Sequence, residues 1–337
     1  MNILDVFNTD PFKVSTLTAA INERPYLPGT LRNMGLFQSE GINTLTVDIE
    51  RIKGVLKLVP TSARGGPGHK HTSEKRTMKR LSIGHLQVDD FLSADEILGV
   101  REFGSATAIK TLQAEVLARA GAIADNFMMT RENWYMGAVN GKVLDADGTT
   151  ELWNMFDEFG VAEPTQVDFV LATDATKIKT LCNQVLRTIQ TALGAAPYTT
   201  VVGLCGDNFF DKLHEHPEVK GDSNSFIEKE QWSNIAGPWS YIRYGKILWI
   251  NYRGADDGNG PGIDTNKVRF FPVGVPGLFI ERFGPADYVE TVGTKGVPLY
   301  TRTKVAESGK GVEIEVQTNP IVLCTRPGVL VPGITSN

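Results

Sequence analysis

The sequence contains few cysteines and histidines, no excess of positive charge and no long apolar run. Its three cysteines are widely separated in 337 residues, which excludes a disulfide framework and favours a reducing compartment. The net charge of -5 at pH 7 does not favour a general nucleic-acid-binding protein. No apolar run reaches the roughly 18 residues of a membrane span, and the first residues lack the basic region and apolar core of a secretory signal. With 41% hydrophobic and 22% charged residues, the composition is that of an ordinary globular protein.

Motifs that hold phosphate groups or expose a catalytic serine are also missing, including Gly-x-Gly-x-x-Gly, Gly-Lys-Ser/Thr and Gly-x-Ser-x-Gly. Cys205 follows a predicted strand and precedes a predicted helix, where a nucleophile can lie, and His214 is the nearest candidate for its base. We interpret Cys205 as a small buried hydrophobic residue. We therefore expect no catalytic residues and no cofactor.

Two segments resemble metal-binding patterns but have the wrong spacing. His214–His216 lacks the four-residue separation that places two histidines on one helix face, and we interpret it as a helix end. The Asp145–Gly148 segment lacks further ligands of a calcium loop, because Val143 and Asn154 stand at two ligand positions. Asp147-Gly148 instead predicts a hairpin turn. We expect no metal site.

The first ninety residues do not have the pattern of a self-contained domain. Residues 1–38 have scattered apolar side chains and no sustained helical or strand period. An alternating run from Leu45 to Glu50 leads to a Gly/His/Lys-rich tip at residues 64–71, and a second alternating run returns through residues 78–88. These patterns predict an open arm followed by a long two-stranded finger. Because a lone hairpin is marginally stable in water, we expect neighbouring copies of the chain to supply the missing contacts.

The finger carries segregated basic charge on a chain that is acidic overall. Its cations, opposed by Glu74 alone, are Arg64, Lys70, Lys75, Arg76, Lys79 and Arg80. Three interpretations are open: a solvated hairpin whose lysines prevent edge-to-edge aggregation, docking onto an acidic surface of a neighbouring subunit, or contact with nucleic acid. We favour docking onto a neighbouring subunit.

The remainder of the chain predicts a mixture of helices and strands. Apolar residues spaced three or four apart predict one long helix over residues 107–136, about 45 Å long at about 1.5 Å per residue. Ser93 and the acids that follow it predict the start of a short helix. Further helices are predicted after Asp174 and at 209–217, and strands at 167–171, 199–204, 240–252, 268–271, 278–282, 311–317 and 321–324.

Several motifs, in order along the chain, resemble the lambda-type tailed-phage major capsid proteins, the capsid E family. The segment Leu36–Thr44, with its Phe-x-x-x-Gly-x-x-Thr pattern, resembles the N-terminal motif of that family. The other matching features are the Arg64–Gly68 tip, the helix end Arg131–Ala138, the hairpin Gly141–Gly148, and the closing motifs Asn319-Pro320 and Arg326–Gly328. The likeness extends over essentially the full length.

The resemblance implies an α+β fold of the Hong Kong 97 type, the tailed-phage major capsid fold. Carried over by position, its parts are an N-terminal arm (1–44), an extended loop (45–92), a peripheral domain with a long spine helix (93–163), an axial domain (164–298) and a return to the peripheral domain (299–337). Contacts between subunits are expected from the six finger cations and from five arm residues, Phe7, Phe12, Tyr26, Leu36 and Phe37.

The function implied by the resemblance is that of a major capsid protein. Copies form pentamers and hexamers of an icosahedral shell that encloses double-stranded DNA without sequence specificity. Because the sequence begins with the arm, a separate scaffolding protein is expected, together with a portal, while a decoration protein is left open. The expected location is the virion capsid, after assembly in the host cytoplasm and without a membrane.

Two alternatives remain at this point. The first is the shell of a protein nanocompartment, which has the same fold and encloses an enzyme instead of DNA. The second belongs to another class of protein, an α/β enzyme that uses Cys205 with His214. Shell formation and nucleic-acid content distinguish the first from a capsid, and the ionisation of the Cys205 thiol tests the second.

Overall fold

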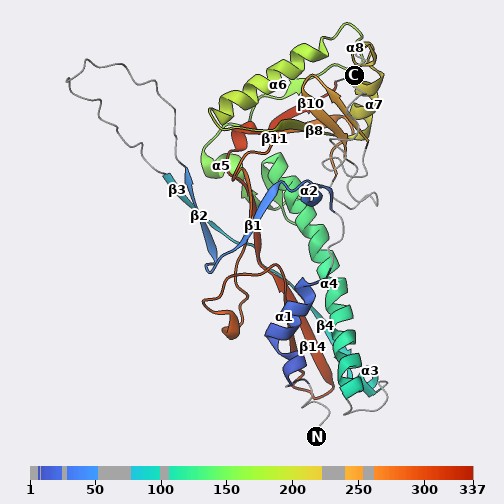
Figure 1. The fold of residues 1–337 in the computed structure, drawn as a ribbon, viewed down its shortest axis with the longest axis vertical. Coiled ribbons are helices and arrows are strands. Elements are labelled where there is room, and N and C mark those ends of the chain that lie inside the picture. Colours follow the sequence, from blue (N-terminus) through green and yellow to red (C-terminus); the bar gives the residue numbers. More distant parts are fainter. Residues whose placement is uncertain are drawn as a thin grey trace, which may run out of the picture. The chain divides into compact units, whose positions relative to one another are not determined.

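A computed structural model of the chain describes residues 7, 9–24, 29–51, 77–98, 106–221, 240–252 and 262–336 (Figure 1). The chain forms two compact units, each with helices and strands. Unit 1 comprises Met1–Val47, Ser82–Tyr135 and Ile280–Val322, and unit 2 comprises Asp48–Leu81, Met136–Phe279 and Leu323–Asn337.

Unit 1 contains a helix in a segment for which the sequence predicts no regular structure. α1, Val14–Asn22, follows a 3-10 turn at Asp10–Phe12. The prediction of an irregular arm over residues 1–38 is therefore wrong for this part of the chain. The apolar pattern of α1 is short, with Leu17 and Ile21 one turn apart, and both side chains are buried. So short a pattern is a weak signal for a helix, because the burial of Leu17 and Ile21 depends on elements far away in the sequence.

Two short helices of unit 1 are α2, Thr30–Asn33, and α3, Ala94–Leu98. The start of α3 has the predicted cap. The backbone N–H of Ser93 donates to Glu96 Oε2 at 2.8 Å, and the backbone nitrogen of Glu96 lies 3.4 Å from Ser93 Oγ. This reciprocal pair is a capping box, which satisfies N–H groups that have no partner within the helix.

α4, Ala106–Asn140, confirms the long helix predicted for residues 107–136 and extends it to 35 residues. The helix continues through Gly137, where a Cβ would lie 2.8 Å from the Val143 backbone, and stops at Gly141, which has a φ of +84°. A glycine in this left-handed region is a common helix end. Although α4 is long, no helix in the described part of the chain is apolar enough to span a membrane.

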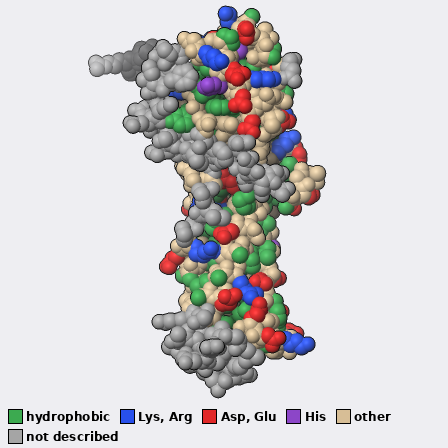
Figure 2. Space-filling view, turned by 90° about the vertical axis from the view of Figure 1, so that its right-hand side faces the viewer, with side chains coloured by type: hydrophobic (Ala, Val, Ile, Leu, Met, Phe, Trp, Pro, Cys, Tyr) green, Lys and Arg blue, Asp and Glu red, His purple; other side chains and the backbone are tan. Residues whose placement is uncertain are grey.

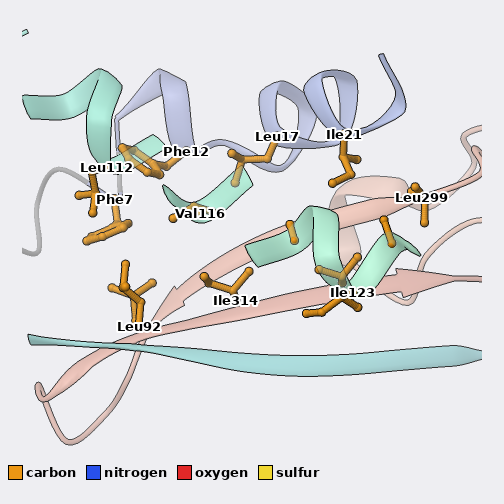
Figure 3. Close-up of a cluster of buried hydrophobic side chains, with 14 of the residues drawn as sticks. Phe7, Phe12, Leu17, Ile21, Leu92, Leu112, Val116, Ile123, Leu299 and Ile314 are labelled. Atoms are coloured by element: carbon orange, nitrogen blue, oxygen red, sulfur yellow. The ribbon is translucent and has the colours of Figure 1, made fainter. Parts of the chain in front are cut away.

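A three-stranded antiparallel sheet with the order β13-β14-β4 forms the other layer of unit 1. Its strands are Tyr300–Val305, Gly311–Thr318 and Leu86–Ser93, respectively. One face of this sheet packs with α1 and α4 around a common hydrophobic core, called here the unit 1 core (Figure 3). Its members include Phe7, Phe12, Leu17, Ile21, Leu92, Leu112, Val116, Ile123, Leu299 and Ile314.

The two alternating runs of the finger begin as a strand pair, but the second run is divided. β2, Thr46–Arg51, pairs with β3, Thr77–Ser82. The chain then leaves the pair near Gly84, where the Trp134 ring lies 2.8 Å from the place of a Cβ. Residues 86–92, which the prediction assigned to the extended loop, form most of β4 and pair with β14. The strand pair therefore ends at Ser82.

A second three-stranded sheet has the order β1-β12-β15. Its strands are Phe37–Gly41, Phe279–Phe283 and Pro320–Cys324. β12 and β15 agree with the strands predicted at 278–282 and 321–324, whereas β1 was not predicted.

Unit 2 is built on a six-stranded mixed sheet with the order β7-β16-β11-β8-β10-β9, with α6 lying along it in Figure 1. The elements of this unit are β7 Val167–Asp168, β8 Thr200–Cys205, β9 Tyr241–Tyr244, β10 Ile247–Asn251, β11 Lys267–Val273, β16 Val331–Ile334, α5 Met155–Phe159, α6 Ile178–Leu193, α7 Asp207–Glu215, α8 Pro217–Lys220 and a 3-10 turn at Pro327–Val329. Phe169, Phe209, Trp249 and Phe270 form an aromatic cluster in its core, with contacting ring centroids 5.1 to 5.9 Å apart.

The segment 240–252, predicted as one strand, is a hairpin. β9 and β10 pair antiparallel and are joined by Gly245 and Lys246, whose φ angles are +60° and +65°. Two successive positive φ angles are typical of a type I′ turn, the tight turn that matches strand twist. The sequence does not show this turn clearly, because Lys246 is an unusual residue in the left-handed region.

The start of α6 also differs from the prediction. Asp174 was predicted to cap this helix, but the carboxylate of Glu218 accepts the backbone N–H of Ile178 at 2.7 Å instead. The preceding strand, predicted over 167–171, stops early because Val170 has a φ of +41°, which is incompatible with an extended strand.

The last strand lies in the segment 299–337, whose expected return to the peripheral domain stays a prediction. β16 pairs antiparallel with β11 and parallel with β7, within the sheet of unit 2. The sequence Val331–Ile334 gave no strand signal, because proline and glycine are rare inside strands. Gly333 is needed for close packing, since the Phe270 ring lies 2.9 Å from where a Cβ would stand.

The Asp147-Gly148 turn is confirmed. It joins β5, Lys142–Leu144, to β6, Glu151–Asn154, in an antiparallel hairpin. The Asp147 carboxylate accepts the Thr150 hydroxyl at 2.6 Å and backbone N–H groups of the turn, and these hydrogen bonds lower the pKa of Asp147. The carboxylate therefore stabilises the turn itself.

Candidate assembly surfaces

Two of the arm residues predicted to contact other subunits lie in the unit 1 core. Phe7 and Phe12 are 5% and 3% exposed, and their ring centroids are 4.8 Å apart. Both face Leu112 and Val116 of α4 (Figure 3). In the described chain these aromatic rings contact their own unit, so a contact with a neighbouring subunit requires the arm to leave this position. That contact stays a prediction.

Two further arm residues, Leu36 and Phe37, lie at the start of β1. Leu36 is buried, and the ring of Phe37 stacks on Tyr135 with a centroid separation of 4.3 Å. Tyr26 lies outside the described residues. The Phe37–Tyr135 stack attaches β1 to α4 within unit 1.

A buried ion pair, which was not predicted from the sequence, joins three elements of unit 1. Arg131 of α4 is 2% exposed and Glu281 of β12 is fully buried. Glu281 Oε1 accepts hydrogen bonds from Arg131 Nε at 3.0 Å and Nη2 at 2.6 Å, and from the Tyr135 hydroxyl at 2.6 Å. The Ser39 hydroxyl of β1 bonds to the other carboxylate oxygen.

This network satisfies the buried carboxylate from all sides, as a buried charge requires. Burial also raises the pKa of the Tyr135 phenol, so that the hydroxyl remains a donor to Glu281. The available sequence signal was a glutamate inside the apolar strand segment Phe279–Phe283. Its partner could not be found in the same way, because Arg131 is 150 residues away in sequence.

Two of the predicted finger cations lie at the described base of the extended loop, and both have partners in unit 2. Lys79 Nζ is 3.4 Å from Glu158 Oε2, and Arg80 Nε is 2.8 Å from Asp48 Oδ1. The hydrogen bond from Arg80 lowers the pKa of Asp48. The other four finger cations, Arg64, Lys70, Lys75 and Arg76, lie outside the described residues.

The β13-β14-β4 sheet has an outer face opposite the unit 1 core. Glu313 lies across from Phe91, and Glu315 lies across from Asp89, so that these four side chains share this face. We call Asp89, Glu313 and Glu315 the acidic strip. On the same face, Arg302 and Lys304 of β13 lie across from Glu315 and Glu313, so two cations border the strip. The ring of Phe91 is 43% exposed beside it. Since its three carboxylates outnumber the two bordering cations, the strip keeps a negative balance that a basic finger could bind, and it was not predicted from the sequence.

Charges near α4 are paired more closely. Acidic, basic and hydrophobic side chains are intermixed on the face of α4 shown in Figure 2. Arg119 lies within 2.6 Å of Glu96, 3.1 Å of Glu115 and 3.6 Å of Asp90. The Ser93 backbone N–H and then the Arg119 guanidinium lower the pKa of Glu96 to about 2. Because paired charges of this kind offset one another, they attract a neighbouring subunit only weakly.

The predicted burial of Cys205 is confirmed. Its side chain is fully buried, the thiol lies 3.5 Å from the Gly203 carbonyl oxygen, and burial raises its pKa well above the ordinary value. Burial likewise raises the pKa of Cys182 and Cys324 to about 12. A buried protonated thiol is a poor nucleophile. In the described ranges no three His, Cys, Asp or Glu side chains are grouped to hold a metal ion.

Comparison with solved structures defines the class of the fold. The crystal structure of a proposed capsid protein from a prophage of E. coli CFT073 superposes with a TM-score of 0.57 at 12% identity, covering 96% of this chain and 99% of that one. The fold is therefore the tailed-phage major capsid fold of the Hong Kong 97 type. At this level of identity the likeness concerns the fold alone.

The family follows from sequence comparison. The profile of the family "Phage major capsid protein E" matches residues 13–335, and the chain belongs to this family. The major capsid protein of Pseudomonas phage KPP10 is 25% identical over 96% of both chains. That of Salmonella phage Felix O1 is 24% identical over 95% of both chains. The chain is accordingly a structural protein of a phage head.

Proposed function

We propose that copies of this chain assemble through pentamers and hexamers into an icosahedral shell that encloses double-stranded DNA. The observation that carries the proposal is the family match over residues 13–335, which includes parts of both units. Head-to-tail contacts between identical copies close into rings when the rotation permits. Assembly takes place in the host cytoplasm, and the finished shell is the virion capsid.

The proposed partners are other copies of the chain, a separate scaffolding protein and a portal. The packaged DNA is enclosed without sequence-specific contacts, in keeping with the net charge of -5. A decoration protein is not part of the proposal, because no surface of the described chain distinguishes such a partner.

We further propose that the finger cations of one copy dock on the acidic strip of a neighbouring copy. The excess of carboxylates over Arg302 and Lys304 on the strip, set against the positive charge of the finger, supports this pairing, since complementary charge increases the encounter rate and fixes the register of a contact. Lys79 and Arg80 have partners within their own unit. The proposed contact therefore depends mainly on the four cations at residues 64–76.

The assembly proposal is tested by electron microscopy of the particulate fraction after expression of the chain, alone and with its neighbouring genes. Closed shells, or sheets and tubes of hexamers, are expected. A uniformly small species under all conditions would contradict the proposal.

The docking proposal is tested with the charge reversals Lys75→Glu/Arg76→Glu and Glu313→Lys/Glu315→Lys. Each pair alone should slow shell formation about tenfold or more at low salt, because steering by charge is lost. The effect should shrink at about 1 M salt, where the Debye length is about 3 Å. Combining the two pairs should restore part of the rate. Equal rates for all four proteins at low salt would refute the docking.

A further inference from the structure

We propose that an apolar loop tip of unit 1, at Val289 and Val292, binds in a hollow of unit 1 on a neighbouring copy. The proposal rests on the assembly function above and names one of the contacts by which copies join. Its evidence is the construction of the loop, the exposure of its tip, and the lining and charge of the hollow.

The loop is closed tightly at its base by two glycines. Gly284 and Gly296 are so close that a Cβ on Gly296 would overlap the carbonyl oxygens of Phe283 and Gly284. The Gly296 N–H donates to the Ile42 carbonyl oxygen at 2.8 Å, and the Ile42 N–H donates to the Phe283 carbonyl oxygen at 2.8 Å. Residues 284–296 therefore form a compact loop with adjoining ends, a type of loop that is frequently functional. It is the brown segment with one helical turn in Figure 1.

Internal hydrogen bonds fix the conformation of this loop. A 3-10 turn, Val289–Thr291, lies at its tip. The Thr291 hydroxyl is 2.7 Å from the Ala286 carbonyl oxygen, and the Thr294 hydroxyl donates to the Thr291 carbonyl oxygen at 2.7 Å. Tyr288, just before the turn, is buried. The tip is thus presented by an ordered loop.

The tip exposes apolar surface to an unusual degree. Val289 is 86% exposed and Val292 is 78% exposed, whereas the other exposed large hydrophobic side chains of the described residues reach at most 65%. Two valines held outward on an ordered loop leave most of their surface in water in the isolated chain. Binding a partner would remove their apolar surface from water.

A hollow of about 650 Å³ lies beside the loop, in the same unit. Its apolar lining comes from the arm, from the segment before β13 and from the first residue of β13: Phe7, Phe12, Val14, Val297 and Tyr300. Residues Glu290, Thr291 and Thr294 of the loop form another part of its wall. Tip and hollow are therefore neighbours on one surface, and each is apolar.

The charges around the two features are complementary. The tip carries Glu290 between its two valines. The described lining of the hollow carries Lys295 and Arg302, together with Lys13, whose Nζ is 2.6 Å from Asp10 Oδ1, and Glu290 is its single carboxylate. A second copy of the chain is the occupant that fits, because this chain itself carries both the exposed apolar tip and the apolar hollow, and it belongs to a family of phage major capsid proteins. A tip in a neighbour's hollow is a head-to-tail contact, the type that builds closed rings.

The first test replaces the tip valines, Val289→Asp/Val292→Asp, in the full chain. The yield of closed shells should fall at least about tenfold, which corresponds to only about 1.4 kcal/mol per contact. The thermal unfolding of unassembled protein should not change. Ser308→Asp/Lys310→Asn, on the exposed turn between β13 and β14, changes the net charge equally and should leave the yield unchanged. Normal yield from the tip variant, with shells from the unmodified chain, would overturn the inference while leaving the assembly function intact.

The second test identifies the partner surface even if the first variant folds poorly. A tagged chain with Val292→Cys is co-assembled with an untagged chain carrying Ser15→Cys, which lines the hollow. The three native cysteines are buried and do not compete. Mild oxidation should give a tagged–untagged heterodimer. Homodimers of Val292→Cys would show that tips meet each other, and no cross-link within intact shells would exclude the contact; either result overturns the inference. Failure of the unmodified chain to form shells would instead count against the assembly function.

Discussion

Replacing Glu281 by glutamine should destabilise unit 1 strongly while hardly changing its shape. Glutamine keeps the size of the side chain and one acceptor oxygen, but the positive charge of Arg131 is then left without a counter-ion at 2% exposure. Removing one partner of a buried ion pair lowers the free energy of unfolding by about 3–5 kcal/mol. In a domain of about 150–250 residues each kcal/mol lowers the melting temperature by about 2–4 °C, so we expect a decrease of roughly 6–20 °C.

Scanning calorimetry of the unassembled chain measures this effect, with Glu313→Gln as the matched control. Glu313 is exposed on the outer face of the β13-β14-β4 sheet, and its replacement should change stability by less than about 0.5 kcal/mol. Adding Arg131→Met to Glu281→Gln should recover part of the loss, because the buried charge is removed. Equal melting temperatures for Glu281→Gln and Glu313→Gln, or strictly additive effects of the two buried changes, would refute the role of the pair.

Two other predictions concern stability. Leu17→Ala should cost about 2–5 kcal/mol in chemical unfolding, because the side chain is fully buried in the unit 1 core; a loss below about 1 kcal/mol would show that α1 is not packed there. Glu96 has a pKa of about 2 in the folded chain against an ordinary 4.5, so its stabilising effect is present above pH 4.5 and lost as the pH falls towards 2. The melting temperatures of the unmodified chain and Glu96→Gln should therefore converge below pH 2, and a constant difference from pH 6 to pH 2 would contradict the assignment.

The packing of the arm in the unit 1 core limits how the role of the arm in assembly can be tested. If the arm were open, removal of residues 1–38 would leave a folded subunit that cannot assemble. Phe7, Phe12, Leu17 and Ile21 are all buried in the unit 1 core, however. Losing four such side chains, at about 2–5 kcal/mol each, approaches the whole stability of a typical domain. Point changes at the surface are therefore the better test of assembly.

The elements predicted well from the sequence are those whose signal is local. α4 shows an apolar stripe over many turns, α3 has its capping residues next to it, and the β5–β6 hairpin has Asp147-Gly148 at its turn. In each case the residues that determine the element are neighbours along the chain. The full-length order of such motifs also led to the family.

The elements missed or misplaced depend on distant partners. α1 has only two buried apolar positions and becomes a core helix because α4 and the β13-β14-β4 sheet form the unit 1 core with it. The second finger run continues past Ser82 in its alternation, but its last part, β4, pairs with β14, more than 200 residues later in the chain. The hollow and the Arg131–Glu281 pair likewise combine residues from separate segments, so no spacing rule could reveal them.

The position of α1 separates the folding of the subunit from its assembly into shells. Its buried residues are contributed by one chain, so the helix forms in a first-order folding step that does not depend on protein concentration. Shell formation, by contrast, is a reaction among copies and obeys mass action. Subunits released by dilution should consequently keep α1 protected from hydrogen exchange and remain ready to reassemble without refolding.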